Sequence, residues 1–191
     1  SKISDGKSTI YGVNTGFGSL CNTRIDSKDL AQLQVNLIRS HACGMGDYVP
    51  HDIIKLMLLL KVKSLSYGHS GVQLKTVEKL LDFFNTSTLP VIYELGSLGA
   101  SGDLAPLSHM SLPLIGEGKV WSKDSQTIES AKPSDLVLGP KEGLALINGT
   151  QFMQAYGLSC LFKAKKILER ADVHAALCLD AYDGRKEPFL N

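Results

Sequence analysis

A glycine-punctuated loop that runs into an apolar helical pattern most constrains how this 191-residue chain can fold. Glycine recurs at every third position, at Gly96, Gly99 and Gly102. The loop backbone is therefore free to take positive φ values and to turn tightly on itself. Asp103 is placed to cap the helix that follows, and Pro106 falls in its first turn, where a missing N–H costs little. Loop and helix start are expected to form one unit.

Three interpretations of this loop are open from the residues alone. A helix-capping turn is the ordinary one, because glycine-rich loops punctuate most folds. Phosphate binding is disfavoured, because the loop lacks the Gly-Lys-[Ser/Thr] ending of a P-loop and the G-x-G-x-x-G spacing. The third is a cofactor precursor. If the Gly102 nitrogen attacks the Ala100 carbonyl carbon, a five-membered ring closes, and loss of water from the ring and from Ser101 leaves an electrophilic methylene.

The sequence Gly-Ser-Leu-Gly-Ala-Ser-Gly-Asp-Leu-Ala-Pro-Leu, residues 96–107, resembles the signature of the aromatic amino acid ammonia-lyases. In that family the Ala-Ser-Gly triplet cyclises to 4-methylidene-imidazol-5-one (MIO). The resemblance implies that Ala100, Ser101 and Gly102 form this cofactor, which is an electrophile of a kind that no encoded side chain offers. The capping interpretation then describes the same loop.

A second motif, Tyr-Gly-Val-Asn-Thr-Gly-Phe-Gly at residues 11–18, lies in a polar, glycine-rich loop expected over residues 1–25. Taken alone it is typical of a turn with a half-buried tyrosine. It closely resembles the family loop that carries the catalytic tyrosine, which implies that Tyr11 is the general acid/base. Because an unperturbed phenol has a pKa near 10, the site would have to stabilise its phenolate or share its proton.

A third motif places a histidine on a predicted helix that begins near residue 27. Leucines at helical spacing, ending with Leu37, put His41 on the apolar face, where a histidine is ordinarily a core residue. Residues 38–44, Ile-Arg-Ser-His-Ala-Cys-Gly, resemble the family segment that selects the substrate ring. Ser-His there is similar to the histidine ammonia-lyases, although tyrosine lyases also use histidine. The resemblance implies that His41 faces the substrate side chain.

A fourth motif is Lys-Glu-Gly-Leu-Ala-Leu-Ile-Asn-Gly-Thr at residues 141–150. Asn148-Gly149 marks a turn that can cap the next helix. The stretch resembles the family segment whose asparagine reaches the MIO loop and the substrate. Asn148 is thereby implied to orient the amino acid or to stabilise developing charge as a hydrogen-bond donor.

The remaining pattern predicts a mainly α-helical, bundle-type fold with one small β element. Helices are expected to dominate residues 27–116. A hairpin is expected at about 119–129, where two short β-rich runs flank a polar turn, and no other strand is predicted. One long helix is predicted from about 150 to 180, a length typical of a bundle. Within the helical region, apolar spacing predicts separate helices over 52–67, 72–84 and 104–115.

Composition narrows the class of partner. The net charge is +1, so no strong field favours nucleic acid or a membrane surface. The most apolar run, residues 53–60, is too short to cross a bilayer. The four cysteines are widely spaced and no histidine shows metal-ligand spacing, which favours a cytoplasmic protein with reduced thiols and no metal. A small polar metabolite is the expected partner.

The resemblance covers essentially the whole chain and implies elimination of ammonia from L-histidine to give urocanate, in a homotetramer with sites shared between subunits. It also implies a polypeptide two to three times as long, of which this is the N-terminal part; the start at Ser1 without methionine agrees. The family's carboxylate-binding tyrosine and arginine, and its glutamine and glutamate residues, come from a later helical region. We therefore expect 191 residues alone to be inactive, with a loop that stays uncyclised if that region is needed to strain it.

Several alternatives stay open. Within the family, the alternatives are phenylalanine or tyrosine as the substrate, or the reaction of an aminomutase. Outside the family, the alternatives are a non-catalytic helical fragment or assembly module and, least favoured, a phosphate-binding protein. Whether MIO is attacked by the substrate amine or by its ring is also open.

Overall fold

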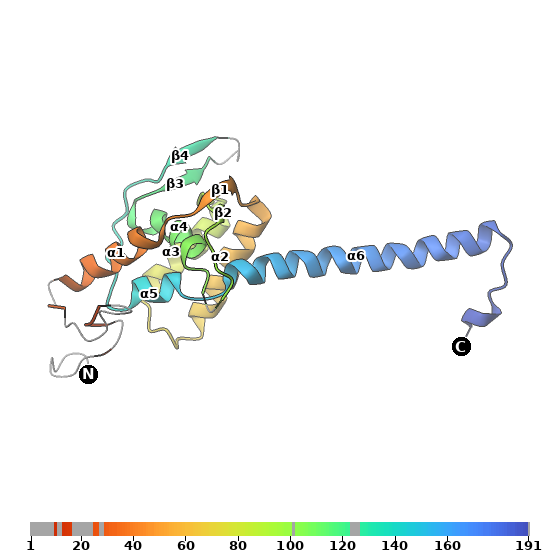
Figure 1. Cartoon of the computed structure of the whole chain (residues 1–191), viewed down its shortest axis with the longest axis horizontal. Helices are drawn as coiled ribbons and strands as arrows, with labels where there is room; N and C mark the ends of the chain where they lie inside the picture. The colour runs from red at the N-terminus through yellow and green to blue at the C-terminus, as the bar shows by residue number, and fades with distance from the viewer. Residues whose placement is uncertain are drawn as a thin grey trace. The chain divides into compact units, whose positions relative to one another are not determined.

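The structure is a computed structural model that describes residues 10, 13–16, 25–26, 29–100, 102–122 and 127–190 (Figure 1). It divides into two compact units, residues 1–155 and 156–191. The fold is mainly helical, as the sequence predicted. In chain order, the first unit contains α1 (Leu30–His41), β1 (Met45–Tyr48), α2 (His51–Ser66), α3 (Leu74–Thr86), β2 (Tyr93–Leu95), α4 (Leu104–Ser111), the 3-10 turn η3 (Leu112–Ile115), β3 (Lys119–Trp121), β4 (Ile128–Ser130) and α5 (Glu142–Ile147).

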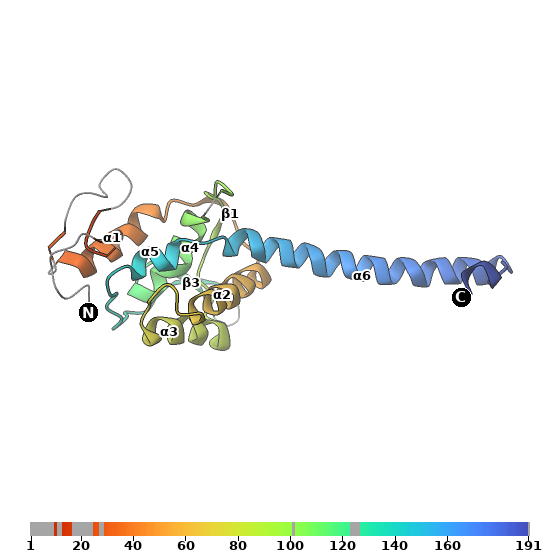
Figure 2. The same ribbon diagram turned by 90° about the horizontal axis from the view of Figure 1, so that it is seen from below.

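The core of the first unit forms around α4, the helix that follows the glycine loop. α4 packs against α1, α5 and β2, and α2 packs along α3 (Figure 2). Leu107 and Met110 of α4 and Ile54 and Met57 of α2 are completely buried. Because each such side chain contributes about 1.5–3 kcal/mol on burial, the packing of these side chains stabilises the position of α4. The glycine loop is thus attached to a helix that is buried in the core of the unit.

Two small antiparallel sheets complete the first unit. β3 pairs with β4 in the register Lys119 to Ser130, so the predicted hairpin is present, and its second strand begins at Ile128. β1 pairs with β2, with Met45 opposite Leu95, and this sheet was not predicted. Both of its strands are very short. All four β1 residues are exposed, so β1 has no buried face that an alternating pattern of apolar residues would reveal. The expectation of a single β element was therefore wrong.

α6 (Gln151–Ala181) is a helix of 31 residues whose first five residues belong to the first unit. It occupies the region where a long helix was expected. The second unit, taken by itself, consists of the rest of α6 and the 3-10 turn η4 (Glu187–Phe189). In the described part of the chain, no helix combines the length and the apolar character that a membrane span requires.

Candidate functional site

Two loop segments far apart in the sequence lie against each other in the first unit. Residues 96–103 precede α4, and residues 148–150 connect α5 to α6. The Asp103 N–H donates a hydrogen bond of 2.7 Å to the Gly149 carbonyl oxygen. A Cβ placed on Gly102 would lie 3.1 Å from Asn148 Oδ1. The structure therefore brings two predicted site residues together, and the missing side chain at Gly102 leaves room for the Asn148 carboxamide.

The glycine loop uses its backbone freedom at two of its three glycines. Gly96 has φ +137° and Gly99 has φ +63°, whereas Gly102 is not among the residues with positive φ. A Cβ on Gly96 would lie 3.0 Å from the Ala105 Cβ and 3.2 Å from the Gly44 Cα, so a side chain at this position would be crowded by its neighbours. The middle of the loop is open: Ala100 is exposed. Ser101, the central residue of the predicted cofactor triplet, lies outside the described residues.

Asp103 holds this loop through its buried carboxylate. Its side chain accepts a hydrogen bond from Ser97 Oγ at 2.6 Å and one from the Met153 N–H at 3.1 Å. Ser97 Oγ in turn accepts the Gly99 N–H at 3.1 Å. The carboxylate makes no capping hydrogen bond to α4, so the predicted cap was wrong. It caps the first turn of α6 instead, because the fold places unpaired N–H groups of that helix beside it.

Asn148 is held in place through its backbone. It ends α5 in an extended conformation, with φ −89° and ψ 128°. Its carbonyl oxygen accepts a 2.9 Å hydrogen bond from Lys61 Nζ of α2. Burial lowers the pKa of Lys61 to about 7. The carboxamide is exposed on the other side, where it is free to meet a ligand as well as Gly102.

The tyrosine-bearing motif is described only in part. Val13 and Thr15 are buried, and Asn14 Oδ1 accepts the Ile10 N–H at 2.7 Å. The Ile25 N–H donates to the Asn14 carbonyl oxygen at 2.9 Å, which joins the motif to the chain just before α1. These residues form a closed turn, as expected for a glycine-rich loop. Tyr11 itself lies outside the described residues.

His41 is the last residue of α1, and one of its ring nitrogens is occupied. Nδ1 lies 2.9 Å from the Leu37 carbonyl oxygen and 3.0 Å from Ser40 Oγ. Because a carbonyl can only accept, Nδ1 carries the proton in the contact with Leu37, and Nε2 is the nitrogen left for a ligand. In the described part of the chain no hydrogen bond joins His41 to Ala100, Gly102 or Asn148. The predicted ring-selecting role therefore stays a prediction.

The segment after His41 is nevertheless anchored to the loop region. The Gly44 N–H donates to His109 Nε2 of α4 at 3.0 Å, and the Tyr93 ring packs on His109 at a centroid distance of 5.0 Å. Burial lowers the pKa of His109, which keeps the imidazole neutral and its Nε2 able to accept. Since Gly44 also lies beneath Gly96, α4 positions the glycine loop and the histidine segment together.

Sequence analysis missed Lys61 and Glu142 as residues that support the site. Glu142, at the start of the helix that carries Asn148, is 1% exposed. Its carboxylate accepts hydrogen bonds from the Gln73 N–H and Nε2 at 2.7 and 2.6 Å, from Thr76 Oγ1 at 2.8 Å and from the Gly139 N–H at 2.6 Å. Lys61 had a usable signal, a charge at a buried helical position, whereas two of the residues that donate to Glu142, Gln73 and Thr76, lie far away in the sequence.

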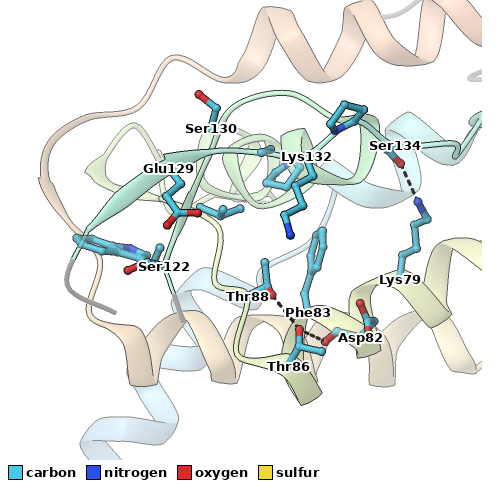
Figure 3. Close-up of a pocket in the computed structure, with 15 residues that line it drawn as sticks. Lys79, Asp82, Phe83, Thr86, Thr88, Ser122, Glu129, Ser130, Lys132 and Ser134 are labelled. Atoms are coloured by element: carbon cyan, nitrogen blue, oxygen red, sulfur yellow. Dashed lines mark hydrogen bonds between the residues drawn. The ribbon is translucent and has the colours of Figure 1, made fainter. Parts of the chain in front are cut away.

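A pocket of about 330 Å³ lies elsewhere in the first unit, between the second half of α3 and the β3–β4 hairpin. Lys132 and Phe83 point into it, and Lys79 Nζ donates to Ser134 Oγ at its edge at 2.8 Å (Figure 3). None of the predicted site residues lines this pocket. The candidate site therefore lies outside this pocket, at an exposed loop pair.

The profile of the aromatic amino acid lyase family matches residues 1–191. The chain belongs to this family. It is 46% identical over 96% of its length to a histidine ammonia-lyase of Streptococcus pyogenes. It also matches the crystal structure of histidine ammonia-lyase from Trypanosoma cruzi, with 40% identity over 97% of the chain and a TM-score of 0.86. A tyrosine aminomutase from Streptomyces globisporus matches 99% of the chain at 36% identity, with a TM-score of 0.88.

The chain spans about a third of the length of these lyase relatives. It covers 37% of the Streptococcus pyogenes and Trypanosoma cruzi enzymes and 36% of the aminomutase. The fold around the paired loops is thus a fold that aromatic amino acid lyases share. The three relatives named above are two histidine ammonia-lyases and one tyrosine aminomutase, so the family includes both kinds of enzyme.

Proposed function

We propose that this chain carries the cofactor-forming part of the active site of a histidine ammonia-lyase, which eliminates ammonia from L-histidine to give urocanate. The observation that carries the proposal is the approach of Asn148 Oδ1 to Gly102, at 3.1 Å from the position of a Cβ there. It joins the asparagine motif to the Ala-Ser-Gly motif, as an active site built from both requires. The similarity to the Streptococcus pyogenes and Trypanosoma cruzi lyases supports histidine as the substrate.

Ala100, Ser101 and Gly102 are the proposed source of MIO, and the described neighbours fit such a ring. The positive φ values of Gly96 and Gly99 turn the loop back on itself, and Gly102 has no side chain to hinder its nitrogen. Ring closure joins the Gly102 nitrogen to the Ala100 carbonyl carbon and releases that oxygen as water. A second water takes the Ser101 hydroxyl and the Ser101 Cα hydrogen. Once formed, MIO supplies the electrophile for removal of ammonia.

The chain's own side chains have separate proposed roles. Tyr11 is the proposed general acid/base. The Asn148 carboxamide orients the amino acid or stabilises developing charge. His41 presents Nε2 to the substrate ring, because its Nδ1 is held by the Leu37 carbonyl oxygen.

Assembly into a homotetramer in the cytoplasm, with sites shared between subunits, is part of this proposal. Its support is the openness of the loop pair in the first unit: Leu98, at the loop tip, is 94% exposed and Asn148 is exposed. A site that removes ammonia through an electrophile gains from exclusion of water, so a further protein surface over this loop is expected. Sedimentation of the protein produced from its complete coding sequence tests the oligomeric state.

Intact mass is the first test of the cofactor. The mass of the protein produced from its complete coding sequence is expected to be two waters below the mass calculated from the sequence. Ser101→Ala has no hydroxyl at this position, so it is expected not to lose the second water. An unmodified wild-type mass together with no release of ammonia would refute the proposal. We expect the 191-residue chain alone to release no ammonia, and measurable urocanate formation from it would refute that expectation.

A second candidate is tyrosine chemistry, either elimination or an amino shift. It is favoured by the likeness to the tyrosine aminomutase, and by the occurrence of histidine in the ring-selecting segment of tyrosine lyases. Assays with histidine, tyrosine and phenylalanine discriminate these reactions. A lyase releases ammonia and an unsaturated acid, whereas an aminomutase gives a β-amino acid without net ammonia.

A further inference from the structure

Lys61 occupies a position on α2 that apolar residues otherwise fill. The buried residues of α2 are Ile53, Ile54, Met57, Leu58, Lys61 and Leu65. Lys61 is only 1% exposed, and no ion pair between its ammonium group and a carboxylate occurs within the described ranges. Burying an ammonium group without a counter-charge is costly, and an apolar side chain of similar length would fit this helix face at lower cost. The presence of a lysine at this position is therefore explained by the hydrogen bond that its amine makes.

That contact is with the candidate site. Lys61 Nζ donates to the Asn148 carbonyl oxygen at 2.9 Å, and no other hydrogen bond of this side chain occurs among the residues that the structure describes. The carbonyl lies at the end of α5, where it has no partner inside the helix. Lys61 supplies that partner from a different helix, whose own position is set by the core packing of Ile54 and Met57.

The hydrogen bond between Lys61 and Asn148 is next to a second hydrogen bond, between Gly149 and the loop before α4. Asn148 is bound through its carbonyl oxygen to Lys61, and the next carbonyl, that of Gly149, accepts the Asp103 N–H at 2.7 Å. Between these two hydrogen bonds the Asn148 side chain reaches Gly102. The peptide between residues 148 and 149 is thus held by α2 on one side and by the cofactor loop on the other.

We propose that Lys61 is a positioning residue of the candidate site, which fixes the 148–149 peptide so that the Asn148 carboxamide faces Gly102 and the Gly149 carbonyl holds the cofactor loop. The role deepens, and rests on, the proposed lyase function. Lys61 does not touch the substrate, because its side chain is buried and its hydrogen bond ends on backbone. It acts through Asn148 and through the loop.

The test compares three variants of the protein produced from its complete coding sequence. Lys61→Met keeps the length and apolar stem of the side chain and removes the donor. Lys61→Arg keeps a donor. Lys63→Met makes the same change as the first at an exposed position on the same helix, and serves as the matched control. Each variant is characterised by thermal unfolding, by intact mass, by kcat and KM for ammonia release, and by hydrogen exchange at the Asp103 amide.

For Lys61→Met we expect an unfolding temperature close to that of the wild type, because losing a buried charge offsets losing its hydrogen bond. We expect kcat to fall about tenfold or more with a smaller change in KM, or the two-water mass loss to become incomplete. Exchange of the Asp103 amide is expected to be about tenfold faster, as for a weakened hydrogen bond. Lys61→Arg should recover part of each loss, and Lys63→Met should match the wild type.

Wild-type kcat and Asp103 exchange in Lys61→Met would overturn the proposal. A loss of activity that follows a loss of stability, without recovery in Lys61→Arg, would also overturn it, since Lys61 would then be only structural. A wild type without mass loss or ammonia release refutes the proposed function separately. In that case the exchange rate of the Asp103 amide still decides whether Lys61 holds the loop pair.

Discussion

Asp103 and Glu142 are the two buried carboxylates among the described residues of the first unit, and both accept hydrogen bonds from separate segments, with different consequences. Asp103 is completely buried and Glu142 is 1% exposed. Glu142 accepts four hydrogen bonds, from the start of α3 and the turn before α5. Asp103 accepts two, one from within the glycine loop and one from the start of α6. A buried carboxylate needs several donors, and where those donors lie decides whether it stabilises the fold or shapes a loop.

The comparison predicts that loss of Glu142 mainly unfolds the protein, whereas loss of Asp103 mainly disturbs the loop. Around Glu142 the four donors come from the start of α3, where Thr76 is completely buried, and from the turn before α5, so loss of their common acceptor separates two segments of the first unit. Around Asp103 the loop tip is already open to solvent, with Leu98 94% exposed, so freed donors can turn to water.

Glu142→Leu should cause the largest loss of stability, about 5 kcal/mol, because four donors lose a buried acceptor at once. Chemical denaturation followed by circular dichroism measures it. Glu78→Gln, on the exposed side of α3, is the control and should stay within about 0.5 kcal/mol of the wild type. A loss below about 1 kcal/mol in Glu142→Leu would show that the Glu142 network contributes little.

Lys61 extends the comparison to a buried amine that has no charged partner among the residues that the structure describes. Its pKa is about 7 when folded and 10.5 ordinarily, so between these pH values the unfolded chain binds a proton that the folded chain lacks. The free energy of unfolding should therefore rise with pH across this window, by at most about 1.4 kcal/mol per pH unit, with the penalty fully present below pH 7. Denaturation at several pH values measures the slope, which Lys61→Met should remove. An identical slope in that variant would contradict the assignment.

Asp103→Asn should cost about 2 kcal/mol, less than the change at Glu142, because the amide oxygen still accepts from one of Ser97 and Met153. Its larger effect should be on the loop, seen as incomplete loss of two waters by intact mass. Asp82→Asn, an exposed change on α3, is the control. If Asp103→Asn unfolds the protein as strongly as Glu142→Leu, the two carboxylates do not differ in kind.

Ser97→Ala should have the smallest effect, about 1 kcal/mol, because Ser97 Oγ makes one hydrogen bond to Asp103 and accepts one from the Gly99 N–H. Faster hydrogen exchange of the Gly99 amide is the direct readout. Ser66→Ala removes an exposed hydroxyl that donates to the Lys63 carbonyl oxygen at the end of α2, and it should leave that amide unchanged. Unaltered Gly99 exchange in Ser97→Ala would exclude the role of Ser97 in shaping the loop.

Local features of the fold could be predicted because they depend on neighbours in the sequence. Apolar spacing predicted the helices before residue 116, since a 3.6-residue period needs only one buried face, whereas the short helix α5 was not predicted. The β3–β4 hairpin was predicted because its strands flank a short polar turn. The β1–β2 sheet was not, because its strands are far apart in sequence and β1 has no buried face. Pairing between distant, exposed strands leaves no local pattern to detect.

The sequence by itself determined the family, the cofactor-forming triplet as an expectation, and the presence of an asparagine motif at a turn before the long helix. Only the tertiary structure decided that Asn148 meets Gly102, that Asp103 binds the start of α6 instead of capping α4, and that Lys61 reaches the Asn148 carbonyl. The reason is physical. Motifs record which groups are present, whereas the partner of a buried donor or acceptor is set by the packing of separate helices, which no single stretch of sequence encodes.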